Sequence, residues 1–101
     1  MISVNSKKLF SMNAEKAVAA IQKHLDATAK KFGYDDIKSA VTYADEPSVA
    51  KFQLEGQAFR AWRSLCWAKC YEIQSQVEDG KMQPPSIEQL IDELPKFNLQ
   101  T

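Results

Sequence analysis

The chain has 101 residues, of which 45% are hydrophobic and 26% are charged, and this composition is typical of one folded domain rather than of a disordered polypeptide. Its 13 basic and 13 acidic side chains give a formal net charge of zero, which argues against binding to nucleic acid or to an anionic membrane surface. No apolar run approaches the roughly 20 residues that span a bilayer. No apolar signal-peptide core follows the first lysines, so we expect a cytoplasmic protein.

The N-terminal part of the sequence predicts an extended arm followed by a helix. Residues 1–12 carry a few alternating apolar residues but no helical periodicity, so we expect a short arm that docks onto a single helical domain formed by residues 13–101. Asn13 is a good N-cap, and apolar residues then recur every three or four positions up to Phe32. Gly33 is suited to end this helix, which is therefore predicted over residues 14–32.

Three further helices are predicted after it. Asp35 can cap a short helix over residues 35–44, and Pro47 fits the first position of a long helix over residues 47–79. Gly56 interrupts the long helix and indicates a local bend or a close contact with another helix. Ser86 and Gln89 form a capping box for a last helix over residues 87–94. The predicted fold class is all-α, a small up-and-down helical bundle with one long central helix and an extended N-terminal arm.

The long helix carries two apolar stripes. At about 100° per residue, the main stripe contains Phe52, Phe59, Trp62, Cys66, Cys70, Ile73 and Val77. A second stripe lies nearly opposite and contains Leu54, Ala58, Ala61, Leu65 and Ala68. A helix that is apolar on two sides is usually central, with partners on several sides. The residues that we expect to form its core and interfaces are Phe52, Glu55, Phe59, Trp62, Arg63, Leu65, Trp67 and Tyr71.

Candidate reactive groups are few. Cys66 and Cys70 fall within the main stripe and are interpreted as buried core residues rather than as a redox pair or metal ligands, because residues four apart on a helix diverge. His24 is the only histidine and is expected at the boundary of the core. Glu55 lies inside the main stripe, where Arg60 or Arg63 is the expected partner. We therefore expect no enzyme, and no catalytic, cofactor-binding or metal site.

Five segments together resemble a group of small proteins encoded by tailed bacteriophages and prophages near their tail-fibre genes. These segments are HLDATA at residues 24–29, GYD at 33–35, TYA at 42–44, EGQAFRAWRSLCW at 55–67 and PSIEQLIDELP at 85–95. The resemblance covers residues 20–95. In longer members a tail-related segment precedes the helical part, and here it is reduced to the short arm.

The resemblance implies a non-enzymatic protein that binds a phage tail or tail-fibre protein during assembly, as a chaperone or as a minor tail component. Its expected location is the host cytoplasm, or the virion tail if the protein is incorporated as a minor tail component. The alternative is a small phage regulatory protein that inhibits a host enzyme by binding to it, and a gene position among early genes rather than tail genes would favour this alternative.

The second stripe also predicts self-association. Its spacings of 4, 3, 4 and 3 residues follow the rhythm of a helix–helix seam, so we expect a homo-oligomer, first of all a dimer, with the long helix at the interface. In the competing arrangement, the first helix and the N-terminal arm cover both stripes within one chain.

Overall fold

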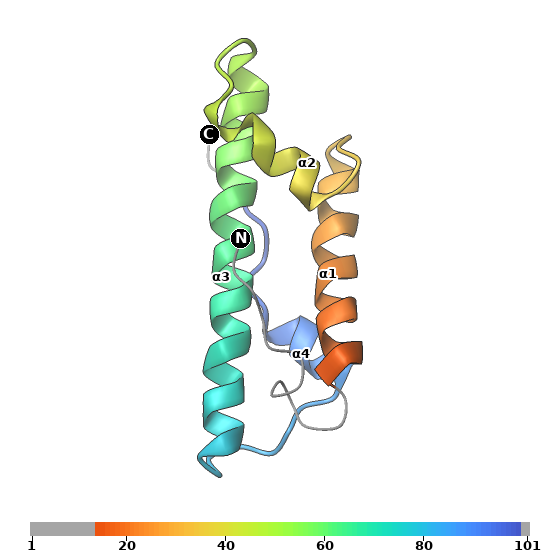
Figure 1. The fold of residues 1–101 in the computed structure, drawn as a ribbon, viewed down its shortest axis with the longest axis vertical. Helices are drawn as coiled ribbons and strands as arrows, with labels where there is room; N and C mark the ends of the chain where they lie inside the picture. The colour runs from red at the N-terminus through yellow and green to blue at the C-terminus, as the bar shows by residue number, and fades with distance from the viewer. Residues whose placement is uncertain (1–13, 100–101) are drawn as a thin grey trace.

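The computed structural model describes residues 14–99, which fold into a long, narrow helical bundle (Figure 1). The elements are α1 (Ala14–Lys31), α2 (Ile37–Val41), the 3-10 helix η2 (Thr42–Asp45), α3 (Ala50–Glu78) and α4 (Ile87–Glu93). Residues 14–99 contain no β-strand, so the predicted all-α class with one long central helix is confirmed for this part of the chain. The predicted arm at residues 1–12 and the predicted cap Asn13 lie outside the described residues.

The two longest helices, α1 and α3, are antiparallel, and the core side chains form a layer between them. Figure 1 shows α1 and α3 running in opposite directions, with α2 and η2 crossing from the end of α1 to the start of α3. The short helix α4 packs near the start of α1, and the segment after it turns back along α3. The layer between α1 and α3 contains the core, in which Ile21, Leu25, Phe59 and Cys66 are completely buried.

The turns around α2 and at the start of α3 differ from the prediction. The side chain of Asp36, rather than Asp35, caps α2 by accepting a hydrogen bond from the Ser39 amide at 2.7 Å. The long helix begins at Ala50 rather than Pro47, because Glu46 accepts hydrogen bonds from the amide and hydroxyl of Ser48 and holds this segment in a turn. The hydrogen bonds to Ser48 also lower the pKa of the Glu46 carboxyl.

The ends of the other helices follow the sequence signals. Gly33 follows α1 with a φ of 95°, in the left-handed conformation that glycine adopts without strain. The capping box of α4 is present, with Ser86 accepting from the Gln89 amide at 3.1 Å and the Gln89 side chain accepting from the Ser86 amide at 2.9 Å.

Gly56 marks a close contact between helices. A Cβ atom at this position would lie 2.5 Å from the Ala44 amide nitrogen and 3.0 Å from the Ala40 carbonyl oxygen. The glycine therefore allows the backbones of α2 and η2 to pack directly on α3. Of the two explanations that the sequence left open for Gly56, the structure shows the close helix contact.

The C-terminal segment completes the core. The Phe97 ring stacks on the Phe59 ring with centroids 4.1 Å apart, and its edge contacts Phe32 and Trp62. The Trp62 indole Nε1–H donates a hydrogen bond to the Pro95 carbonyl oxygen at 2.7 Å. These contacts anchor the end of the chain to the core.

Candidate protein-interaction surfaces

The potentially reactive side chains lie in the core of the bundle or at its edge. Cys66 and Cys70 are free thiols, and burial raises the pKa of each to about 12, so neither is a thiolate near neutral pH. His24 is half-buried at the edge of the core, where burial and the nearby Lys96 and Lys31 lower its pKa. Among residues 14–99, no three His, Cys, Asp or Glu side chains converge to hold a metal ion.

Glu55 is the one carboxylate buried within the described core, with 5% of its surface exposed. It accepts a hydrogen bond from the Tyr34 hydroxyl at 2.7 Å, and not from the arginine that the sequence suggested. Arg60 instead pairs with Asp45 at 3.3 Å on the surface, since the crossing of η2 brings Asp45 beside it. The sequence indicated a special role for Glu55, because it is a carboxylate inside an apolar stripe. It did not indicate the hydrogen-bond donor, because Tyr34 is 21 residues away in the loop after α1.

We expect Tyr34→Phe to lower the free energy of unfolding by about 1.5–3 kcal/mol, because it removes the hydroxyl donor from a buried carboxylate. The double variant Tyr34→Phe, Glu55→Gln should recover part of this loss, since it leaves no charge without a partner. Urea unfolding of the parent, the two single variants and the double variant measures the coupling energy between Tyr34 and Glu55. A Tyr34→Phe protein as stable as the parent would contradict the role of the pair.

The same pair predicts a dependence on alkaline pH. Burial, followed by the bond to Glu55, raises the pKa of Tyr34 above the ordinary tyrosine value of 10.0. Above about pH 10 the unfolded chain releases this phenolic proton while the folded chain keeps it, so stability falls as pH rises. The Tyr34→Phe variant should show a smaller fall in this window, measured by the same unfolding experiment.

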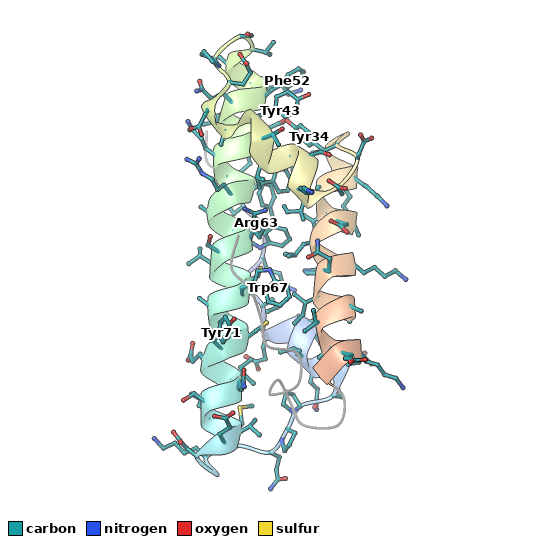
Figure 2. The ribbon with its side chains drawn as sticks, viewed as in Figure 1. Tyr34, Tyr43, Phe52, Arg63, Trp67 and Tyr71 are labelled. Atoms are coloured by element: carbon teal, nitrogen blue, oxygen red, sulfur yellow. The ribbon has the colours of Figure 1, made fainter. Side chains whose placement is uncertain are left out.

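Aromatic side chains continue from Tyr34 onto the surface at one end of the molecule. Tyr43 on η2 contacts Tyr34 with ring centroids 5.6 Å apart and Phe52 on α3 with centroids 5.7 Å apart (Figure 2). Phe52 is 40% exposed and Val49 is 44% exposed. We call Tyr43, Val49 and Phe52 the aromatic patch; the contact of η2 with α3 at Gly56 holds it in place.

A second apolar surface lies along α3, beside the C-terminal segment. Leu65 is 59% exposed and Leu54 is 40% exposed, with Ala58 and Ala61 between them. This surface forms one wall of an open groove of about 500 Å³, whose other wall is the C-terminal segment at Pro95, Lys96 and Asn98. We call Leu54, Ala58, Ala61 and Leu65 the α3 seam.

The structure divides the predicted core and interface residues between these environments. Glu55, Phe59, Trp62 and Trp67 are buried, and Arg63 is half-buried; Figure 2 shows Arg63 and Trp67 on the side of α3 that faces α1. Leu65 and Tyr71 are exposed. Phe52 was predicted in the main stripe with these buried residues and is instead 40% exposed, because α2 and η2 cover α3 near Gly56, one turn further along the helix. Its ring meets that of Tyr43 in an edge-to-face contact.

The fold and these surfaces define a small all-α protein that exposes two separate apolar surfaces. None of the helices within residues 14–99 is long and apolar enough to cross a membrane. Comparison with protein-family models, curated proteins and solved structures gives no match for the chain.

Proposed function

We propose that this chain is a non-enzymatic protein that binds another protein during bacteriophage tail or tail-fibre assembly, acting in the host cytoplasm as a chaperone or joining the virion as a minor tail component. The phage assignment rests on the sequence resemblance across residues 20–95. The aromatic patch carries the binding assignment, because exposed aromatic rings on a fixed scaffold are the residue type that dominates protein–protein affinity.

The geometry of the patch supports this role. Tyr43 and Phe52 expose rings that contact each other. Asp45, two residues after Tyr43 on η2, forms a surface ion pair with Arg60 of α3. An aromatic centre with a polar rim is the usual anatomy of a specific interface. The reactive groups give the proposal indirect support, because the two thiols and Glu55 are buried away from any exposed groove.

Co-expression with the tail-fibre protein encoded beside this gene tests the proposal. We expect the two proteins to co-purify and the soluble yield of the fibre protein to rise. Phe52→Ala should weaken binding by tenfold or more, because a central aromatic anchor contributes about 2 kcal/mol or more. Isothermal titration with the purified fibre protein measures the loss.

Tyr71→Ala is the matched control, since Tyr71 is also an exposed aromatic residue of α3 but lies farther along the helix from the patch (Figure 2). It should leave the affinity within about twofold, and circular dichroism checks that both variants remain folded. Fibre protein that matures equally well without this chain would reject the chaperone role. Binding to a host enzyme in place of the fibre protein would support the inhibitor alternative.

A further inference from the structure

The α3 seam has no cover among the described residues, although it is the most exposed apolar part of the helix. Leu65 has the largest exposed fraction of the exposed large apolar side chains, 59%, and Leu54, near the other end of the seam, is 40% exposed. Both leucines line the groove whose other wall is the C-terminal segment. Burying such a surface against an apolar partner is favourable.

The order of residue types and their spacing along the α3 seam is the same from either end. Its residues are Leu54, Ala58, Ala61 and Leu65, with spacings of 4, 3 and 4, so its midpoint falls between Phe59 and Arg60. A two-fold axis at this midpoint, perpendicular to two antiparallel copies of α3, places Leu54 opposite the partner's Leu65. It also places Ala58 opposite the partner's Ala61, where small side chains let the helices approach closely. This is the self-complementary pattern that a two-fold interface requires.

The charges beyond each end of the seam favour the same orientation. Lys51 lies one turn before Leu54 and Glu72 lies one turn after Ala68, and both are exposed. Antiparallel helices bring Lys51 close to the partner's Glu72 at both ends of the interface. Parallel helices would place like charges together. Glu72 also pairs with Lys69 of its own helix at 3.6 Å, and its exposed carboxylate retains room for a second cation.

We propose that the α3 seam binds a second copy of this chain in an antiparallel, two-fold symmetric dimer. The α3 seam together with its flanking charges, from Lys51 to Glu72, is about 32 Å long at 1.5 Å per residue. A strip of this length and about 10 Å wide on each copy covers roughly 640 Å² in total, below the roughly 1,200 Å² at which stable specific interfaces begin. We therefore expect a weak dimer that forms only at high protein concentration.

The dimer places one aromatic patch near each of its two ends. Val49, the N-cap of α3, and Phe52 precede the seam in the chain, so an antiparallel arrangement separates the two patches along the molecule. A dimer of this form presents two equivalent binding surfaces to the partner of the proposed function, but its formation does not depend on that partner. Failure of fibre binding and failure of dimerisation are therefore separate results.

Light scattering of the full chain from about 5 to about 500 µM tests the association. We expect the mass to rise with concentration from 11.4 kDa towards twice that value. Leu65→Glu should weaken the dimer by at least a hundredfold, because it places a charge in an apolar seam, and should leave the monomer folded because residue 65 is exposed. Val49→Glu, at a similarly exposed apolar residue outside the seam, should have little effect.

A mass of one chain at every concentration would overturn the proposal, and would be the result if residues 1–13 cover the seam within the same chain. A dimer that Leu65→Glu leaves unchanged would also overturn it.

Charge reversal and cross-linking test the orientation. Lys51→Glu and Glu72→Lys should each weaken the dimer by about three- to tenfold, and the double variant should recover most of the loss. With a short bismaleimide, a Leu54→Cys chain should cross-link to a Leu65→Cys chain, and neither variant should cross-link to itself. The native thiols of Cys66 and Cys70 should not react with the maleimide, because they are buried and their pKa is about 12. Efficient cross-linking of Leu65→Cys to itself would overturn the antiparallel arrangement.

Discussion

Replacing Gly56 by alanine is expected to destabilise the protein by about 2 kcal/mol or more, although alanine is the better helix former by about 1 kcal/mol. The new methyl group would lie 2.5 Å from the Ala44 amide nitrogen and 2.8 Å from the Tyr43 carbonyl carbon. Both atoms belong to backbone, so no side-chain rotation relieves the clash, and α2 with η2 must move away from α3. Urea unfolding followed by circular dichroism measures the loss.

Ser75→Ala is the control for helix propensity, because Ser75 is exposed on the same helix and lies far from α2 and η2. It should change the free energy of unfolding by no more than about 0.5 kcal/mol. A Gly56→Ala protein that is more stable than the parent would mean that propensity alone governs the position. Because η2 also carries Tyr43, the same variant should weaken binding at the aromatic patch.

Local signals in the sequence predicted most of the helices. The Ser86–Gln89 capping box and the glycine at position 33 depend on atoms within a few residues of each other, so their geometry follows directly from the sequence. The buried stripe of α3 from Phe59 to Ile73 was also predicted, since its period is that of one helix face.

The predictions failed where several local structures competed or where the partner is distant. Asp35 and Asp36 are both possible caps, and only the path of the chain from α1 selects Asp36. Periodicity placed Phe52 and Phe59 on one stripe, but it carries no information about how far along α3 the covering helices extend. The Tyr34–Glu55 pair requires the loop after α1 to meet α3, which is a property of the whole fold.

The candidate surfaces were partly predictable for the same reason. The spacing of residues alone predicted the second apolar stripe. Its exposure depends on the path of the rest of the chain, which places the C-terminal segment beside the stripe as the second wall of the groove. The aromatic patch was not predicted, because Tyr43 and Phe52 come from different elements and meet through the turn at Glu46 and Ser48.

Replacing Phe97 by alanine is expected to lower the free energy of unfolding by about 2–4 kcal/mol, near the lower end for buried aromatic truncations because the ring is only half-buried. The variant loses the stacking on Phe59 and the edge contacts with Phe32 and Trp62. It leaves a space between α1 and α3 that no other aromatic ring of the C-terminal segment can fill, since Phe97 is its only one. Urea unfolding measures the change.

Tryptophan fluorescence distinguishes release of the segment from a local cavity. Trp62 is buried and donates to the Pro95 carbonyl oxygen, so a released segment would expose its indole to water and shift the emission to longer wavelength. Phe97→Leu keeps an apolar side chain in the space and should cost less than Phe97→Ala, with little change in emission. Unchanged stability and emission in Phe97→Ala would show that the segment after α4 contributes nothing to the core. Because Pro95 and Lys96 also form one wall of the groove beside the α3 seam, a released segment would remove that wall and alter the surface that we assign to the dimer.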